Sequence, residues 1–543
     1  MTDPLAADLG LGSWPRRRAR IDAAAVALVH GDRSLTYGEL AGSVEHLAAA
    51  FAALGVRAGD RVAYLGLNDV LTVQAMFAAH RLRAIFVPVN LRLAPAEVQH
   101  VLADAAPAIV VVGPDGGRLL AAALVALSAS SVAHVVAVDE TEGAPIAAAG
   151  HREVHLVAPL VEHPGAVAPS VAVALEDDAV ILYTSGTTGR PRGAVLTHAS
   201  LTWNTVNQLA HLDILSTDRA LCIAPLFHAV GLSQVTLPVL FKGGTVEIVE
   251  RFEAGDVLRR IEEHRISSFA CVPTMLQLMI EHERWASSDL GSLRQVVYGG
   301  SPVSAPVAAA WRERGVRLQQ GYGMTEASPG VAMAPLDGAE RALTSVGVPH
   351  FFTDIALFVD DEPASLAPGD RGELLVRGPH VFRGYWRDDE KTEAAMVRTP
   401  SGDWYRTGDV LAVDEDGWLH VVDRVKDLII SGGENIYPAE IEALLVALPE
   451  VRSAAVVGRP DERWGEVGVA YVELAAGVVD PADPAARDAL VERLCAHLAA
   501  RLARFKLPQQ VVVVDELPRN AVGKVLKPQL RADAAARTPQ EDP

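Results

Sequence analysis

The sequence predicts an α/β protein with two sheets of parallel type, a β-rich subdomain and a small α+β domain at the C-terminal end. Short apolar runs such as 61–66, 84–89 and 108–112 are typical of buried strands. Between them, 71–82 and 94–102 carry apolar residues at helical spacing. This alternation favours parallel sheets covered by helices. At 543 residues the chain is too long for one core, so two or more domains are expected.

The pattern of apolar and turn residues changes twice after the alternating region. From about Ile355 short strands with turn residues, as in 372–378, predict the β-rich subdomain. The strongest candidate boundary is 423–427, which divides the chain into an N-terminal domain of residues 1–424 and a C-terminal domain of residues 425–543.

The C-terminal segment contains a helical and a strand pattern. Leu490, Leu494, Leu498 and Leu502 stand four residues apart, which predicts an amphipathic helix. A strand is expected at 511–514, and the polar tail after Ala532 is expected to be disordered.

Charge and composition exclude several classes of partner. The chain has 48 basic and 68 acidic residues, a net charge of −20, which disfavours nucleic acid and anionic membranes. A nucleotide site would therefore have to be locally basic or assisted by a metal ion. The three cysteines are far apart and form no CxxC pattern, and neither a secretory signal nor a long apolar span is visible. A cytoplasmic protein is expected.

A loop rich in glycine and hydroxyl residues, 183–193, follows the apolar run 179–183. Gly186, Gly189 and Gly193 allow positive φ and a close approach of the backbone to a ligand. Backbone amides, hydroxyls and guanidinium groups together predict a cradle for a polyphosphate, although the loop lacks the GxxxxGK[ST] pattern of P-loop NTPases. The alternative is a flexible surface loop.

Seven further segments occur in a fixed order after this loop. They are 225–231, 298–302, 320–327, 404–409, 423–426, 431–442 and 518–524. With the loop, and from about residue 35 onward, they resemble the adenylate-forming acyl-CoA synthetase superfamily. The resemblance implies an ATP-dependent carboxylic acid–CoA ligase, which forms acyl-AMP and pyrophosphate and then acyl-CoA and AMP.

The resemblance also implies which residues bind ATP. The phosphate-binding group is Thr184, Ser185, Gly186, Thr187, Thr188, Gly189 and Arg192, with arginine where the family usually has lysine. The adenosine-site segments supply Gly299, Gly300, Ser301, Gly321, Tyr322, Gly323, Met324 and Thr325, in which the glycines allow close approach and Tyr322 offers an aromatic plane. Asp409 is expected to hold the ribose hydroxyls, and Arg424 the ribose and phosphates.

The remaining roles concern the metal, the acid and CoA. Glu326, with Thr184, is expected to bind Mg²⁺. The acyl pocket is expected to be lined by His228, Val230, Gly231, Gln234, Gly300 and Gly323. The expected catalytic residues are Lys524, His228, Glu326 and Arg424. The small domain is expected to be a mobile lid that pivots at Lys426, brings in CoA over Gly432 and Gly433, and contacts it through Trp464, for which core packing is the alternative.

Three other functions share parts of this pattern with CoA ligation. An enzyme that loads a separate carrier protein would share almost every motif, but this sequence contains no carrier segment. A luciferase-type monooxygenase and a non-catalytic nucleotide-binding homologue are further alternatives. Small or uncharged pocket residues favour an apolar acid, which leaves fatty, alicyclic and aryl acids open.

Overall fold

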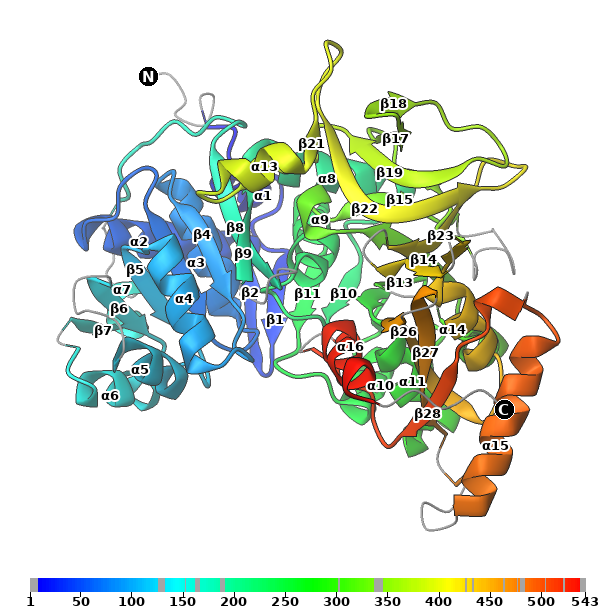
Figure 1. The fold of residues 1–543 in the computed structure, drawn as a ribbon. Coiled ribbons are helices and arrows are strands. Elements are labelled where there is room, and N and C mark those ends of the chain that lie inside the picture. The colour runs from blue at the N-terminus through cyan, green and yellow to red at the C-terminus, as the bar shows by residue number, and fades with distance from the viewer. Residues whose placement is uncertain are drawn as a thin grey trace.

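The computed structural model describes most of the chain. The described residues are 8–125, 132–151, 153–161, 167–185, 191–300, 303–335, 345–424, 427–431, 434–461, 464–475, 477–478, 484–502, 504–520 and 523–537. Figure 1 shows four sheets with their helices. The predicted fold class is confirmed: two largely parallel sheets, an antiparallel sheet and a separate C-terminal α+β sheet. Among the described residues, no helix has the length and apolarity needed to cross a membrane.

The first α/β unit is an eight-stranded sheet in the order β20-β9-β8-β4-β3-β5-β6-β7, parallel from β8 to β7. Side chains alternate in β3, so Val62 and Ala63 enter different cores. Helices α2, α3 and α7 cover one face, and α4, α5 and α6 the other. The bounds are β3 (Arg61–Leu65), β4 (Ile85–Val89), β5 (Ile109–Val112), β6 (His134–Ala137), β7 (Val154–Leu156), β8 (Asp178–Ser185), β9 (Pro191–Thr197), β20 (Gly384–Tyr385), α2 (Tyr37–Ala53), α3 (Val70–Arg81), α4 (Pro95–Ala105), α5 (Gly117–Val125), α6 (Glu140–Ala148) and α7 (Val157–Val161).

The second unit is a nine-stranded sheet in the order β16-β15-β14-β13-β12-β10-β11-β1-β2, parallel from β14 to β1. Helices α8 and α9 pack on the face toward the first unit, and both join the core that includes α2 and α3. Helices α10, α11 and α12 cover the opposite face. The bounds are α1 (Trp14–Ile21), β1 (Val26–His30), β2 (Arg33–Thr36), α8 (His198–His211), β10 (Arg219–Cys222), α9 (Leu237–Lys242), β11 (Thr245–Ile248), α10 (Ala254–Glu263), β12 (Ser268–Cys271), α11 (Pro273–Glu281), β13 (Gln295–Gly299), α12 (Ala305–Glu313), β14 (Leu318–Gly323), β15 (Gly330–Met333) and β16 (Val348–Pro349).

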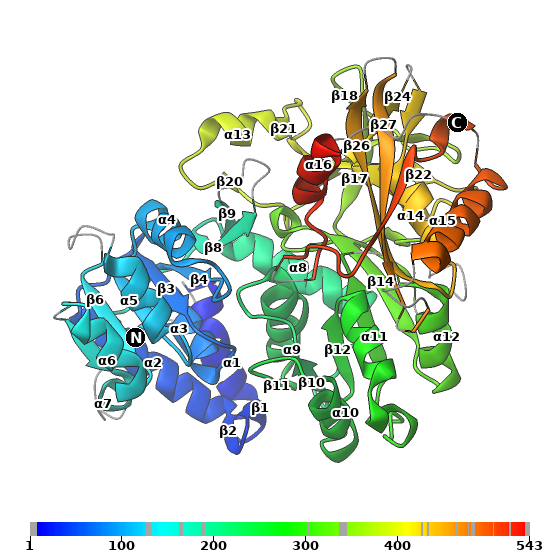
Figure 2. The same cartoon turned by 60° about the horizontal axis from the view of Figure 1, so that its bottom comes forward.

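The antiparallel sheet and the C-terminal sheet complete the fold. The first contains β17 (Asp354–Val359), β18 (Glu362–Ala364), β19 (Arg371–Arg377), β21 (Met396–Val397), β22 (Trp404–Val413) and β23 (Leu419–Arg424), with α13 (Asp389–Ala394) between β20 and β21. The second contains β24 (Ile429–Ser431), β25 (Glu434–Ile436), β26 (Val451–Asp461), β27 (Gly465–Leu474) and β28 (Gln510–Val514), with α14 (Pro438–Val446), α15 (Pro484–Ala499) and α16 (Lys527–Ala536). Figures 1 and 2 both show this sheet on the α11 side of the molecule.

The end of the chain corrects one expectation. The tail was expected to be disordered after Ala532, but α16 continues to Ala536. Ala534 is fully buried against the C-terminal sheet, and Asp533 accepts a hydrogen bond of 2.6 Å from the Tyr471 hydroxyl. The composition of the tail is polar, but tertiary packing of its small residues orders it. The leucine pattern is confirmed in α15, where Leu490, Leu494 and Leu498 are buried, while Leu502 lies beyond the helix.

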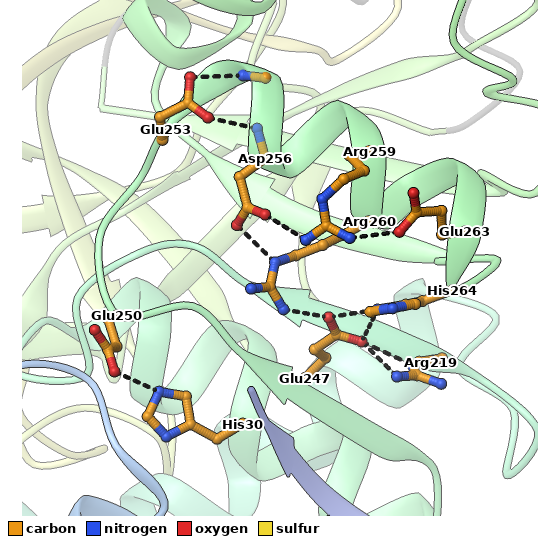
Figure 3. A network of polar contacts seen from close by, with 11 residues as sticks. His30, Arg219, Glu247, Glu250, Glu253, Asp256, Arg259, Arg260, Glu263 and His264 are labelled. Carbon is orange, nitrogen blue, oxygen red and sulfur yellow. Dashed lines mark hydrogen bonds and ion pairs between the residues drawn. The ribbon is translucent and has the colours of Figure 1, made fainter. Parts of the chain in front are cut away.

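A buried carboxylate fastens α10 to the nine-stranded sheet (Figure 3). Glu247 on β11 is fully buried and accepts hydrogen bonds from Arg219 at 2.6 Å, and from Arg260 and His264 at 2.8 Å each. Burial alone would raise the pKa of Glu247, but the bonds from Arg260, His264 and Arg219 outweigh it and hold the pKa below its usual value. The network therefore holds an ionised carboxylate in the interior.

We expect Glu247→Gln to lower the free energy of unfolding by about 1–3 kcal/mol, because the two guanidinium groups lose their buried counter-charge. The measurement is thermal or urea unfolding followed by circular dichroism. The matched control is Glu263→Gln on α10, the helix that Glu247 fastens; its carboxylate is half exposed and should contribute less than about 1 kcal/mol. Equal effects of the two substitutions would contradict the prediction.

Candidate active site

The candidate site lies where parallel strands of the nine-stranded sheet end. Their carboxyl ends meet at one edge of the sheet, which is where ligands bind in open α/β folds. Chain segments leaving β10, β12, β13 and β14 carry His228, Thr274, Gly300 and Glu326, respectively. Residues far apart in the sequence are therefore collected at one edge by the topology.

The predicted phosphate loop joins β8 to β9. These strands pair antiparallel, with Thr184 opposite Arg192 and Ser185 opposite Pro191. Gly186, Thr187, Thr188 and Gly189 lie outside the described residues. The Arg192 charge also acts on Tyr385, where burial and then Glu326 are the main causes of a raised pKa. The charges of Arg192 and of the predicted metal carboxylate Glu326 therefore both act on Tyr385, in opposite directions.

Glycines allow the strands of the predicted adenosine site to approach closely. Gly299 on β13 pairs with Gly321 on β14, and a Cβ at Gly299 would lie 2.9 Å from the Gly321 carbonyl oxygen. A Cβ at Gly323 would lie 1.9 Å from the Pro329 carbonyl oxygen, which excludes any larger residue without rearrangement. Gly300 has φ +86°, a conformation that favours glycine. Ser301 lies outside the described residues.

Asp409 and Tyr322 meet across two sheets. The Tyr322 hydroxyl donates a 2.8 Å hydrogen bond to Asp409 Oδ2, and Asp409 is only 4% exposed. Its neighbour in the register of β22 and β23 is Arg424, whose side chain lies outside the described part of the structure. The structure therefore brings an aromatic ring, a buried carboxylate and the backbone of Arg424 to one place.

Glu326 lies in the short helix η5 (Thr325–Ala327), directly after Met324. Glu326 Oε1 accepts a 3.0 Å hydrogen bond from the Tyr385 hydroxyl, and its carbonyl oxygen accepts one of 2.8 Å from the Phe382 amide. Because Tyr385 is on β20, which pairs with β9, Glu326 is tied to the strand that follows the phosphate loop. Sequence reasoning missed Tyr385, which belongs to no segment of the resemblance.

His228 follows β10 and precedes the π-helix η3 (Val230–Thr236). Burial lowers the pKa of His228 to about 4, with a smaller contribution from the charge of Arg92, so the ring is neutral at pH 7. Its Nε2 is buried, and no described residue forms a hydrogen bond with it. Val230 and Gln234 are partly exposed, whereas Gly231 is buried and a Cβ there would lie 2.4 Å from the Pro225 carbonyl oxygen.

A buried polar cluster, which sequence reasoning missed, adjoins Gln234. Gln234 Nε2 donates a 2.7 Å hydrogen bond to Gln208 Oε1 on α8, while Gln208 Nε2 is buried and has no hydrogen-bond partner within the described part of the chain. A Cβ at Gly330 would lie 2.7 Å from Gln208 Nε2 and 2.9 Å from His350 Nε2, so Gly330 leaves room where these polar atoms converge. Neither ring nitrogen of His350 has a hydrogen-bond partner among the residues that the structure describes. The only sequence signal is the unusual polarity of buried α8, which contains Asn204, Thr205 and Asn207.

Lys524 stands in a tight turn of the C-terminal segment, beside the edge of the nine-stranded sheet at which the candidate site lies. Gly523 has φ +79°, and the Lys524 amide donates to Asn520 Oδ1 at 2.9 Å. Arg519 fastens the turn to the C-terminal sheet through a 3.1 Å hydrogen bond to buried Glu473 on β27. A Cβ at Gly523 would lie 3.3 Å from Thr274 Oγ1, so the turn contacts the beginning of α11. The Lys524 side chain is exposed.

The predicted hinge and CoA residues are only partly described. Lys426, Gly432 and Gly433 lie outside the described residues. Trp464 is 46% exposed, so this side chain is not part of a core.

Comparison with known proteins identifies the family. The protein-family model described as "AMP-binding enzyme" matches residues 15–386, and the family model "AMP-binding enzyme C-terminal domain" matches residues 440–524. A feruloyl-CoA synthase from an Amycolatopsis species is 45% identical over 96% of this chain and 98% of its own length. The indoleacetate–CoA ligase of Aromatoleum aromaticum is 40% identical, over 97% and 99%.

Solved structures agree with this assignment. The fatty acyl CoA synthetase of Mycobacterium tuberculosis is 30% identical, with a TM-score of 0.75 over 98% of this chain and 99% of that one. The o-succinylbenzoate CoA synthetase of Bacillus subtilis, solved with its acyl-adenylate intermediate, is 32% identical, with a TM-score of 0.78 over 97% and 99%. This chain belongs to the family of AMP-binding enzymes.

Proposed function

We propose that this enzyme, an ATP-dependent acid–CoA ligase, activates an aromatic acid that carries a hydrogen-bonding group at the end remote from its carboxylate. The reaction joins the acid to AMP with release of pyrophosphate, and then transfers the acyl group to CoA with release of AMP. The observation that carries the choice of acid is the buried Gln208 Nε2 beside Gln234, for which the described residues supply no hydrogen-bond partner. A buried amide left without a partner costs about 1–3 kcal/mol, which a substrate oxygen could recover.

The first half-reaction brings two anions together, so its barrier is largely electrostatic. The acid's carboxylate attacks the α-phosphorus of ATP, and the bond to pyrophosphate breaks. Neutral His228 has a buried Nε2 without a hydrogen-bond partner in the described ranges, and it is suited to hydrogen-bond the carboxylate without adding a charge. Arg192 and Lys524 are assigned to the negative charge on the phosphates, where a single such contact commonly contributes about 10²–10³ in rate.

A magnesium ion fits the chemistry of the donor set near the phosphate loop. Glu326 supplies a half-buried carboxylate tied through Tyr385 to β9, and Thr184 supplies a hydroxyl at the end of β8. Mg²⁺ prefers one or two carboxylates together with phosphate oxygens and water. When bound, Mg²⁺ would neutralise phosphate charge, and Glu326 with Thr184 would hold it.

The second half-reaction requires a change of partner at the site. We assign residues 425–543 as a lid that turns about Lys426, which removes Lys524 and admits CoA past Gly432 and Gly433. The exposed ring of Trp464 is available to contact the CoA nucleotide. The thiol then attacks the acyl carbonyl, and AMP leaves.

The relatives favour CoA as the acceptor and an aromatic acid as the substrate. Those at 45% and 40% identity are named for feruloyl and indoleacetate groups, which are aromatic and carry a phenol or an indole N–H. Both are named as forming CoA thioesters, which speaks against loading of a carrier protein.

Pyrophosphate release with a panel of aryl, fatty and alicyclic acids, with and without CoA, tests the proposal. A preference for fatty acids would overturn the choice of acid.

The polar end of the pocket gives a sharper prediction. We expect Gln208→Leu to reduce kcat/KM about 5–150-fold for the preferred hydroxylated or N–H-bearing acid, because one hydrogen bond of 1–3 kcal/mol is lost. The analogue without that polar group should lose little or gain. The measurement is the ratio of the two kcat/KM values by pyrophosphate release.

The control for this experiment is Gln74→Leu on α3, which removes a buried amide that donates to the Ser43 hydroxyl on α2. Both helices belong to the eight-stranded unit, whereas Gln208 belongs to the nine-stranded one. This change should leave the ratio of the two acids unaltered. If Gln208→Leu also left the ratio of the two kcat/KM values unaltered, the Gln208 amide would not bind the polar group of the acid.

A further inference from the structure

We propose that His134, Glu153 and His155 form a binding site for one divalent transition-metal ion of the zinc type, separate from the nucleotide site. The three residues lie on β6 and just before or within β7, the two outermost strands at one end of the eight-stranded sheet. Figures 1 and 2 both show these strands at the side of the molecule opposite α15. The candidate active site is built on other strands.

The strand geometry directs the three side chains to one face. Glu153 and His155 are two positions apart, so they point to the same side of an extended chain. In the parallel register of β6 and β7, Val136 is opposite His155, and Val135 is opposite Val154. His134 and Val136 share a face for the same reason, which places His134 beside Glu153.

The distances fit a tetrahedral ion. His155 Nε2 lies 3.4 Å from His134 Nδ1 and 3.8 Å from Glu153 Oε2, and the ligand atoms of all three lie within 4.8 Å of one another. Zinc–nitrogen bonds of about 2.0–2.1 Å in a tetrahedron imply a nitrogen–nitrogen separation of about 3.3–3.4 Å. Without an ion, the same 3.4 Å separation is a long hydrogen bond between the two rings, whose centroids lie 5.5 Å apart.

His151 is a further candidate ligand. It precedes Glu153 by two positions, so 151–155 reads His-x-Glu-x-His. Its Nε2 is buried and has no hydrogen-bond partner among the described residues. Two imidazoles and one carboxylate leave the fourth position of a tetrahedral ion to His151 or to a water molecule.

The donor set also selects the metal. Imidazole nitrogens suit Zn²⁺, Co²⁺, Ni²⁺ and Cu²⁺, whereas Mg²⁺ prefers an all-oxygen shell. The Mg²⁺ used in adenylation should therefore not occupy this site. A metal that clamps β6 to β7 would stabilise the sheet edge and leave the chemistry of ligation unchanged.

The test uses the full-length protein, freed of metal with a chelator and titrated with Zn²⁺ alone by calorimetry, with melting temperature as a second readout. We expect one equivalent to bind and the melting temperature to rise, with no such effect of Mg²⁺. His155→Gln and His134→Gln should each weaken binding by at least about 10–100-fold, the loss seen when even an outer-sphere partner of a metal is removed. Both variants should keep acyl-CoA synthesis.

The control is His46→Gln on α2, outside the cluster, which should bind Zn²⁺ like the unmodified protein. Two results would overturn the proposal. One is the absence of stoichiometric Zn²⁺ binding by the metal-free protein. The other is binding that survives unchanged in both His155→Gln and His134→Gln, which would place the ion elsewhere.

Discussion

Replacing Lys524 by alanine is expected to reduce the rate of acyl-AMP formation by at least about 10²–10³-fold, while acyl-AMP supplied from outside still reacts with CoA. The ammonium group is needed when the carboxylate and the triphosphate are brought together, and not when the thiol displaces AMP. The turn that carries Lys524 contacts the start of α11 at Thr274 and is fastened to the C-terminal sheet through Arg519 and Glu473.

Two assays separate the half-reactions: exchange of labelled pyrophosphate into ATP for the first, and thioester formation from synthetic acyl-AMP for the second. The control is Lys527→Ala, three residues along, which removes an ammonium group already paired with Glu442 at 2.9 Å. Its effect on both assays should be small. Equal loss of both half-reactions in a folded Lys524→Ala protein would refute the assigned division of roles.

The strands and helices of the α/β units could be predicted because their apolar periodicity is local. The run at 61–66 became β3 (Arg61–Leu65), and the helical spacing at 71–82 became α3 (Val70–Arg81). Where the apolar pattern was uninformative, tertiary packing determined which residues are ordered. The tail after Ala532 is too polar and Ala-rich to predict order, yet the C-terminal sheet buries Ala534, and α16 extends to Ala536.

The candidate site could be predicted only where a motif marks it. Tyr322 and Asp409 each stand in a recognisable segment, but their contact across 87 positions depends on the folding of two sheets against each other. Tyr385 and Gln208 stand in no such segment, because a tyrosine or a glutamine becomes part of a site only through its neighbours in space. The cluster of His134, Glu153 and His155 was missed for a related reason, since the pairing of β6 with β7 brings its members together.

Replacing Asp409 by alanine is expected to reduce kcat/KM for ATP by about 10²–10⁴-fold, because two hydrogen bonds to a charged acceptor contribute about 1.5–3 kcal/mol each. Asp409 is buried at 4% exposure, so water cannot easily take over its role. The more specific expectation concerns the sugar. The unmodified enzyme should prefer ATP over 2′-deoxy-ATP by about 10–150-fold, and Asp409→Ala should lose most of that preference.

The matched variant for this experiment is Tyr322→Phe, which removes the hydroxyl bonded to Asp409 but leaves the carboxylate in place. If Asp409 binds the ribose directly, Tyr322→Phe should weaken ATP binding modestly and still discriminate against the 2′-deoxy nucleotide. If Asp409 served only to position Tyr322, the two variants would behave alike with both nucleotides. Because the sugar comparison isolates one hydroxyl of the substrate, it separates direct binding from a loss of folding, which would lower the rates with ATP and 2′-deoxy-ATP by the same factor.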